Sequence, residues 1–337
     1  MIQDAIEHVR SGESLSMVQM TELIDLIMQG KSDDDQIRGL LVALYEKGET
    51  VEELAGAASA MRKHMKPIES RRENLVDTCG TGGGKSGTFN ISTTAAIVAA
   101  SAGAAVAKHG NRKSTSKTGS ADVLAELGVN LECSHDTVQK SLNQIGLCFC
   151  FAPLFHPSVK HVMSVRRSLD HPTIFNLLGP LCNPAAAPHQ VLGAGRGETR
   201  NLVAKALSLL GTQRSIVVHS RDGLGEISID EVTDVSEVRG TVVTEGSFAP
   251  SDFGIERGEM AMLQVEDPPE SAEMIQRVLS GELGPARDIV VVNAAAALWI
   301  SGLADSLAIG ADRCATAIDR GQATETLNDL IKITQRG

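Results

Sequence analysis

The chain has 337 residues, of which 42% are hydrophobic and 22% charged, a composition typical of one large globular domain or two unequal ones. Its net charge of −11 and its 3% share of aromatic residues argue against a DNA or RNA partner, because such partners are bound by basic surfaces and stacking rings. No apolar run is long enough to span a bilayer and the N-terminus has no apolar signal core, so we expect a cytoplasmic protein without membrane contact. The six cysteines contain no C-x-x-C pair, so we expect reduced thiols and no zinc site.

Residues 1 to 66 are predicted to form four short helices. Gly30 and Gly48 occupy positions typical of helix ends, and residues 33–35 are suitable helix starts. The fourth helix is the clearest, because Thr50 and Glu53 have the spacing of a capping box and apolar residues then recur on one face. We therefore expect a small α-helical domain over residues 1–70.

From about Leu75, short β-branched runs alternate with Ala-rich helical stretches. The runs LVDTC, AAVAKHG, LCFCFA, QVLGAG and SIVVHS are typical of strands, and the stretches between them are typical of helices. This rhythm predicts a large α/β domain over residues 71–337 with a mostly parallel central sheet. Residues 225–265 indicate hairpins and loop, and the tail from Pro269 indicates helices with one strand-like run, DIVVV.

A glycine-rich segment follows the first of these predicted strands. Five of the eight residues from Gly80 to Gly87 are glycine, which lets successive backbone N–H groups approach an anion. A helix predicted to start near Ser92 and Thr93 would direct its N-terminus to the same place. The spacing matches neither the P-loop nor the dinucleotide-binding pattern. A tight turn is the alternative, but the position between strand and helix favours phosphate binding.

A second polar segment follows the next predicted strand. Lys108 and His109 end that strand, and a basic loop leads to Gly119 and Ser120 at the start of a helix. Ligands of open α/β sheets bind at the carboxyl ends of strands, so both loops are candidates for the same ligand. Two such loops predict a ligand with two phosphate groups, or a phosphate and a pyrophosphate, whereas a solvated basic loop is the alternative.

Two further stretches carry candidate binding residues. His156 precedes Pro157 at a predicted helix start, and Arg166 lies nearly three turns further near the same face. Arginine is the natural partner of a planar carboxylate, although a structural role is the alternative. After SIVVHS, the loop carries acidic residues whose oxygens suit Mg²⁺ or are merely surface carboxylates: Asp222, Glu226, Asp230 and Glu231.

Together, the stretches KHGNR, GSADVL, HP-x-x-KH, VRR and TIFNLLGPL-x-NP resemble the anthranilate phosphoribosyltransferase family, and the resemblance covers nearly the whole chain. It implies transfer of the 5-phosphoribosyl group from phosphoribosyl pyrophosphate (PRPP) to the amine of anthranilate, the second step from chorismate in tryptophan biosynthesis, with Mg²⁺ as cofactor. It also implies a homodimer through the small helical domain, which would include a returning segment near residues 160–185.

The resemblance assigns roles to individual residues. Its PRPP site comprises Gly80, Thr81, Gly82, Gly83, Thr88, Asn90, Ser92, Thr93, Lys108 and Ser120. Its anthranilate site comprises Gly80, Asn111, His156, Arg166 and Pro180, with Arg166 on or near the carboxylate. Its Mg²⁺ ligands are Ser92 and Glu226, with Asp222 as a further candidate. No general base is assigned, and electrostatic stabilisation is expected from Lys108 and Mg²⁺.

Two positions depart from the family pattern. Gly84 and Gly225 stand where the family usually has Asp, which bears on the number of Mg²⁺ ions. Two alternatives remain open for the function. One is a pyrimidine nucleoside phosphorylase, which shares the fold, and the other is a non-catalytic relative that binds nucleic acid or a partner.

Overall fold

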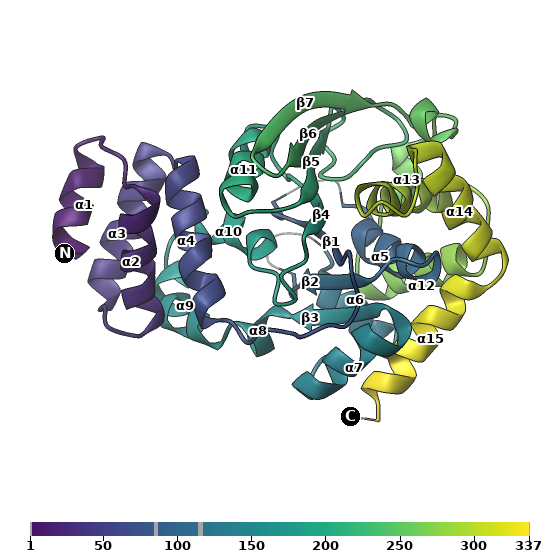
Figure 1. Cartoon of the computed structure of the whole chain (residues 1–337), viewed down its shortest axis with the longest axis horizontal. Coiled ribbons are helices and arrows are strands. Elements are labelled where there is room, and N and C mark those ends of the chain that lie inside the picture. Colours follow the sequence, from purple (N-terminus) through teal and green to yellow (C-terminus); the bar gives the residue numbers. More distant parts are fainter. Residues whose placement is uncertain (1, 84–86, 114–116, 337) are drawn as a thin grey trace.

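The computed structural model describes residues 2–83, 87–113 and 117–336. A helical bundle occupies one end of the long axis, and a larger α/β part occupies the rest (Figure 1). The bundle confirms the four predicted N-terminal helices, which are α1 (Ile2–Arg10), α2 (Met17–Met28), α3 (Asp34–Lys47) and α4 (Val51–His64).

Side-chain caps start three of these helices. Ser16, Asp33 and Thr50 each accept a hydrogen bond from the backbone N–H three residues on, and the side chain there bonds back to the cap backbone. Each such cap stabilises its helix by about 1 kcal/mol. The start signals predicted at residues 33–35 and at Thr50 are therefore confirmed, and Gly48 ends α3 with a φ of +86°.

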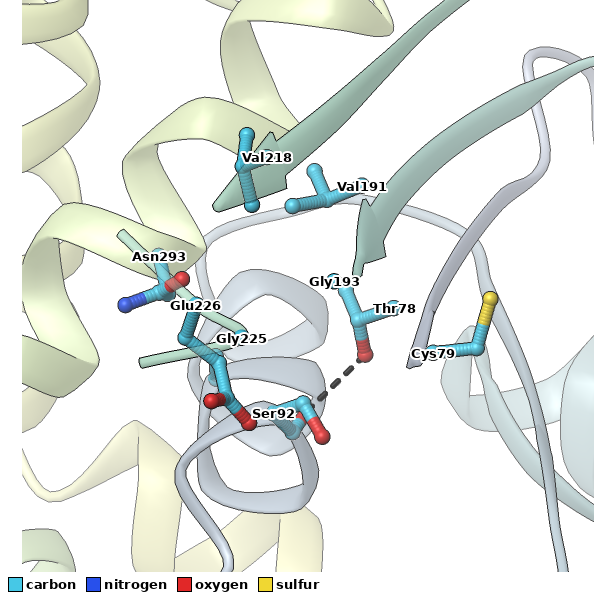
Figure 2. A pocket seen from close by; sticks show the side chains of 10 residues that line it. Thr78, Cys79, Ser92, Val191, Gly193, Val218, Gly225, Glu226 and Asn293 are labelled. Carbon is cyan, nitrogen blue, oxygen red and sulfur yellow. Dashed lines mark hydrogen bonds between the residues drawn. The ribbon is translucent and has the colours of Figure 1, made fainter. Parts of the chain in front are cut away.

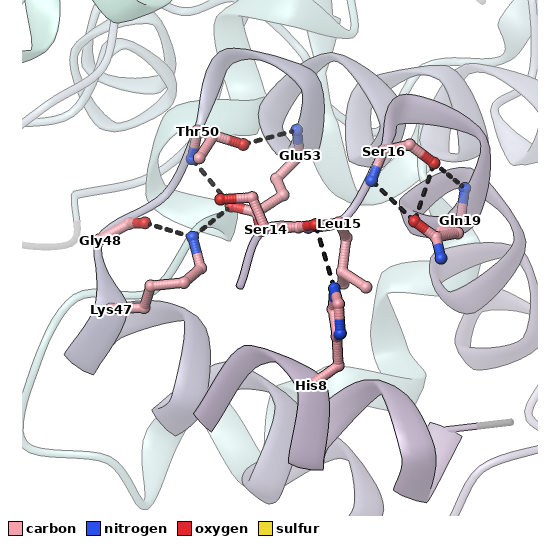
Figure 3. Close-up of polar contacts among 9 residues, drawn as sticks. All are labelled: His8, Ser14, Leu15, Ser16, Gln19, Lys47, Gly48, Thr50 and Glu53. Carbon is pink, nitrogen blue, oxygen red and sulfur yellow. Dashed lines mark hydrogen bonds and ion pairs between the residues drawn. The ribbon is translucent and has the colours of Figure 1, made fainter. Parts of the chain in front are cut away.

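Glu53 extends its cap into a contact between helices (Figure 3). Its fully buried carboxylate accepts hydrogen bonds from the backbone N–H of Leu15 at 3.0 Å and from Lys47 Nζ at 3.0 Å. A buried carboxylate is costly unless it is paired and hydrogen-bonded, as this one is. The residue thus joins the segment before α2 and the end of α3 to the start of α4.

The larger part is built on one seven-stranded sheet with the order β3-β2-β1-β4-β5-β6-β7. The strands are β1 (Val76–Gly80), β2 (Val106–Gly110), β3 (Leu147–Phe151), β4 (His189–Gly193), β5 (Arg214–Ser220), β6 (Thr233–Arg239) and β7 (Val242–Phe248). The five strands from β3 to β5 are parallel, and β6 and β7 add an antiparallel hairpin at one edge. The mostly parallel sheet and the hairpin within residues 225–265 are both confirmed.

Helices cover both faces of this sheet (Figure 1). On one face, α5 (Ile91–Ser101) and α13 (Pro285–Ile300) pack on the central strands, and α14 (Leu307–Asp319) packs on both helices. On the other, α11 (Thr199–Leu209) packs between the sheet and α4. The remaining helices are α6 (Ser120–Glu126), α7 (His135–Ile145), α8 (Ala152–Phe155), α9 (Lys160–Arg167), α10 (Phe175–Leu178), α12 (Pro268–Leu279) and α15 (Gln322–Thr334), with short 3₁₀ turns η1 (Pro157–Val159), η2 (Gly179–Leu181), η3 (Pro250–Phe253) and η4 (Met260–Leu263). None of the helices in the described ranges has the length and hydropathy that crossing a bilayer requires.

One predicted strand is wrong. The run DIVVV, residues 288–292, lies inside helix α13. Pro285 suits the first turn of a helix, and the alanines of residues 294–297 continue it. Nearly every side chain of α13 is buried, so the run is apolar all round and has no strand-like alternation to separate it from a buried helix. Tertiary burial here overrides the β propensity of valine and isoleucine.

The segment from 160 to 185 returns to the helical bundle. Helix α9 packs against α2 and α3, and α10 packs against α4. The buried side chains Val162 and Val165 share one apolar core with residues of the bundle, such as Ile24 and Leu41. The precise division of the chain into domains at residue 70 stays a prediction.

Candidate active site

The glycine-rich segment leaves the carboxyl end of β1. The backbone N–H of Thr81 donates to Gly193 O at 2.9 Å, which attaches the start of the segment to β4. Gly82 and Gly83 have φ values of +68° and +82°, a conformation that other residues rarely adopt. The loop geometry therefore needs glycine at these two positions. Gly84 lies outside the described residues.

Asn90, which precedes α5, joins the two candidate loops. Its Oδ1 accepts hydrogen bonds from Thr118 Oγ1 at 2.7 Å and from Ser271 Oγ of α12 at 2.8 Å. In the second loop, Ser120 Oγ donates to Asn111 O at 3.3 Å. Because β1 and β2 are parallel neighbours in the sheet, the loops that follow them lie together at the carboxyl ends of these strands, as the sequence predicts.

Lys108 extends from β2 toward the start of α5. Its Nζ donates to Thr78 O and lies 3.4 Å from Ser92 Oγ, and the residue is 3% exposed. Burial lowers the pKa of Lys108, and the neighbouring carboxylate of Asp77 opposes that shift. Burial raises the pKa of Asp77, and Lys108 opposes it in turn. This buried pair places a cation beside the N-terminus of α5, where backbone N–H groups already favour an anion.

Two threonines of the predicted PRPP site differ in their surroundings. Thr88 pairs with Gln264 in an isolated antiparallel bridge. Thr93, in the first turn of α5, is 1% exposed, and its hydroxyl is the buried side-chain oxygen that has no hydrogen-bond partner within the described residues. Leaving such a hydroxyl unpaired costs about 1 to 3 kcal/mol, so an acceptor brought by a ligand would stabilise it.

Glu226 and Ser92 line a small cleft beyond the ends of β1, β4 and β5. Figure 2 shows the side chains of Glu226 and Ser92 among those that line this cleft. Burial raises the pKa of Glu226 to about 7, against the opposing charge of Lys108. Within the described residues, this carboxylate has no hydrogen bond or ion pair. These residues also contain no group of three or more acidic, histidine or cysteine side chains that could hold a metal ion by itself. A carboxylate and a hydroxyl that line one cleft fit a Mg²⁺ ion that takes its other oxygens from substrate or water.

Asp222 is engaged differently. Its Oδ1 accepts a hydrogen bond from the backbone N–H of Leu224 at 3.0 Å, and its Oδ2 accepts one from Ser228 Oγ at 2.6 Å. Both contacts lie within the loop after β5, which also carries Glu226. Asp222 therefore shapes that loop, and its negative charge adds to the raised pKa of Glu226.

His156 and His109 form a buried pair on the other side of the β2 terminus. Their Nε2 atoms are 3.2 Å apart, and His109 Nδ1 lies 2.9 Å from Gly179 O. Burial lowers the pKa of His109 to about 3 and that of His156 to about 4, so both rings are neutral near pH 7. His109 must donate from Nδ1 to the carbonyl, so its Nε2 has no proton and can only accept.

Arg166 on α9 has no carboxylate partner in the described part of the chain. Its guanidinium lies 5.4 Å from the centre of the Phe175 ring, and one of its nitrogens lies 4.0 Å from Met163 Sδ. Burial lowers the pKa of Arg166, as expected for a cation among apolar neighbours. A guanidinium held this way retains its planar fork of donors for a ligand carboxylate. No hydrogen bond or ring contact joins Arg166 to His156.

Sequence reasoning missed polar residues that lie inside strands. Asp77 in β1 and Gln190 in β4 are both buried, and Gln190 Nε2 donates to Pro180 O at 2.7 Å and lies 3.5 Å from Asp77 Oδ2. His109 accompanies Lys108 in the sequence but was assigned no role. A polar side chain within an apolar strand is costly unless it is paired, and that signal was available in LVDTC and HQVLG.

Comparisons with known proteins cover the same two parts. The pattern of the glycosyl transferase family a/b domain matches residues 72–324, and that of the glycosyl transferase family helical bundle domain matches residues 3–65. An anthranilate phosphoribosyltransferase from Rhodopirellula baltica is 51% identical over 97% of this chain and 96% of its own length. This chain belongs to the anthranilate phosphoribosyltransferase family.

Solved structures of the anthranilate phosphoribosyltransferase family share the whole fold. The enzyme from Thermus thermophilus superposes with a TM-score of 0.92 at 38% identity, over 98% of this chain and 99% of that one. The enzyme from Saccharomyces cerevisiae in complex with PRPP and Mg superposes with a TM-score of 0.91 at 27% identity, over 100% and 98%. The yeast enzyme has also been solved with 4-fluoroanthranilate. The predicted fold class is confirmed.

Gly225 is the departure from the family pattern that the structure describes. The loop runs so close to β4 that a Cβ added at Gly193 would lie 1.7 Å from Gly225 O. A Cβ at Gly225 itself would lie 3.3 Å from Ala194 O, a close contact that a small shift of the backbone would relieve. Glu226 remains the acidic side chain of this loop that lines the cleft.

Proposed function

We propose that this chain transfers the 5-phosphoribosyl group from PRPP to the amine of anthranilate, giving N-(5-phosphoribosyl)anthranilate and pyrophosphate. One observation carries the proposal: the chain is 51% identical to an enzyme of this family over 97% of its length. The two candidate loops, which follow neighbouring strands beside Lys108, support it. In tryptophan biosynthesis this reaction is the second step from chorismate.

The donor side would bind PRPP. Departure of pyrophosphate leaves negative charge on the leaving group, and that charge is where fixed donors lower the barrier most. Lys108, the glycine-rich backbone and the N-terminus of α5 would supply those donors, and Ser120 would contact a phosphate in the second loop. The full proposed set is Gly80, Thr81, Gly82, Gly83, Thr88, Asn90, Ser92, Thr93, Lys108 and Ser120.

Ser92 and Glu226 would hold a Mg²⁺ ion at this side, with Asp222 supporting the loop. When bound, Mg²⁺ supplies positive charge against the pyrophosphate. The fit rests on the Glu226 carboxylate, whose pKa burial raises, and on the Ser92 hydroxyl that lines the same cleft. The complex of the yeast relative with PRPP and Mg supports the same chemistry here.

The acceptor side would bind anthranilate through Gly80, Asn111, His156, Arg166 and Pro180. Arg166 would pair with the carboxylate, because its guanidinium has no acidic partner of its own within the described residues. The neutral ring of His156 would face an uncharged aromatic amine without repelling it. Since such an amine is already unprotonated near neutral pH, holding it in line with C1′ would matter more than a general base.

We also propose the wider setting implied by the family. The chain would be cytoplasmic, would bind no nucleic acid or membrane, and would form a homodimer through its small helical domain, residues 1–70 with the segment near 160–185. Val18 on α2, which is 67% exposed, is consistent with such an interface. Sedimentation of the purified chain should give twice the chain mass, and a monomer that retains activity would reject the dimer.

One assay tests the function. Anthranilate fluorescence should disappear when PRPP and Mg²⁺ are added with the protein, and pyrophosphate should appear in equal amount. Unchanged fluorescence with release of base from thymidine or uridine in phosphate would instead support a pyrimidine nucleoside phosphorylase. No reaction together with a nucleic-acid mobility shift would support a non-catalytic relative.

A further inference from the structure

Three consecutive backbone carbonyls of the turn η2, Gly179–Leu181, each accept a hydrogen bond from a different side chain. The first lies 2.9 Å from His109 Nδ1, the second accepts from Gln190 Nε2 at 2.7 Å, and the third accepts from Arg62 Nε at 2.7 Å. The three donors belong to β2, β4 and α4. The turn is thus held jointly by the central sheet and by the helical bundle.

This turn has little internal support. It is three residues long, and the backbone bond that closes it runs from the Cys182 N–H to Gly179 O at 3.2 Å. A single 3₁₀ turn makes few bonds of poor geometry, so external donors decide where its peptide planes point. An added Cβ at Gly179 would meet no atom within 4 Å, so open space borders the turn.

Gln190 is held in a fixed orientation. It is 3% exposed, and its Nε2 lies between Pro180 O at 2.7 Å and Asp77 Oδ2 at 3.5 Å. Two acceptors on one nitrogen require the amide to present its NH₂ group there rather than its oxygen. The buried carboxylate of Asp77 thereby orients the amide that fixes the Pro180 peptide.

Arg62 reaches the same turn from the helical bundle. Besides its bond to Leu181 O, its guanidinium lies 3.4 Å from Leu210 O at the end of α11. Burial lowers the pKa of Arg62, and within the described residues it forms no ion pair. Its donors are thus used on backbone carbonyls of η2 and α11, so it bridges the two parts of the fold.

We propose that Gln190 and Arg62 are positioning residues for the acceptor subsite, which they shape by fixing the turn Gly179–Leu181 without touching either substrate. The inference rests on the proposed function, in which Pro180 of this turn borders anthranilate. A turn that loses one donor would let the Pro180 ring move, and anthranilate would then bind more weakly. Neither Gln190 nor Arg62 forms a hydrogen bond with the described residues of the loops that follow β1 and β2, so we expect the PRPP loops to keep their geometry.

The first test is Gln190→Met, which has a similar volume but no N–H group. Leaving Pro180 O without its donor should raise the anthranilate KM about tenfold, a typical cost of one buried unsatisfied group. The PRPP KM should change less than about twofold. Val203→Ala, a truncation of a fully buried side chain on α11, is the matched control, because it lowers stability without removing a hydrogen bond to the turn.

The second test is Arg62→Met, which acts from a partly exposed position and remains decisive if the first variant fails to fold. It should raise the anthranilate KM in the same direction, and Arg62→Lys should recover part of the loss because it retains a donor. In the double variant the two effects should be less than additive, because both act on one turn.

The outcomes separate the inference from the function it rests on. A parent chain that consumes no anthranilate overturns the proposed function and this inference together. An active parent overturns the inference alone if either folded variant keeps the parental anthranilate KM, if both substrate KM values rise equally, or if Val203→Ala gives the same anthranilate effect.

Discussion

The donor and acceptor halves of the candidate site are held by different forces. At the donor half, the buried cation Lys108 lies beside a helix N-terminus and a glycine-rich backbone. At the acceptor half, the rings of His109 and His156 are neutral. The carbonyls of the turn Gly179–Leu181 accept hydrogen bonds from two neutral side chains and from Arg62, which has no ion pair within the described residues. The donor half is therefore organised for a multiply charged anion, and the acceptor half for an aromatic ring with one carboxylate. Perturbations of charge and of shape should separate the two.

Removing divalent metal should have the largest effect, and it should fall on the donor half. Excess EDTA is expected to lower turnover at least about 100-fold, because the charge on a departing pyrophosphate would then be opposed by protein groups alone. The initial rate of anthranilate fluorescence loss measures it, and added Mg²⁺ should restore the rate. Full activity in EDTA would reject the metal role of Ser92 and Glu226.

Replacing Lys108 by methionine should have the second-largest effect on activity. It removes the buried cation and leaves Asp77 without its counter-charge, so kcat/KM for PRPP should fall about 100-fold. Lys205→Met is the matched control, since it removes an exposed positive charge from α11. If the anthranilate KM rises as much as the PRPP KM, the separation of the two halves is wrong.

Arg166→Ala should have a smaller effect, confined to the acceptor half. Loss of one charge-assisted pair to the anthranilate carboxylate should raise the anthranilate KM about tenfold to thirtyfold, and should raise the PRPP KM much less. Its neighbour Arg167 is exposed, so Arg167→Ala provides a control that removes an equal charge. Equal changes in both substrate KM values would argue against a carboxylate contact.

The same contrast explains what the sequence could predict. The glycine-rich loop, the caps at Thr50 and Glu53, and the strand-to-loop position of Lys108 depend on residues close together along the chain, so local patterns predicted them. Parallel strand order then brought the two donor loops to one edge.

The support of the acceptor half could not be predicted that way. Its turn is held by residues 62, 109 and 190, whose convergence appears only when the bundle and the sheet pack together. The strand predicted for DIVVV was wrong for a related reason, because burial on all sides of α13 rather than local propensity decided the conformation of this run. Residue roles on both halves remain predictions.

The smallest effect is one of stability, and it tests whether the acceptor histidines are neutral. Their folded pKa values, about 3 and about 4, lie below the ordinary value near 6.5, so between these limits the unfolded chain binds more protons. Their contribution therefore weakens as pH falls through about 6.5, by roughly 1 kcal/mol for the pair between pH 7 and pH 6. Glu226 acts with the opposite sign there, because its raised pKa of about 7 makes the folded state take up a proton first.

The histidine contribution must therefore be isolated by variant rather than read from the parent curve. Urea unfolding midpoints of the parent and of His156→Gln should be compared at both pH values, with exposed His8→Gln as control. The parent should lose more stability than His156→Gln on acidification, by several tenths of a kcal/mol, whereas His8→Gln should follow the parent. Identical losses in all three would mean that His156 is already charged or solvated in the folded chain, and the acceptor half would then resemble the donor half in being organised by charge.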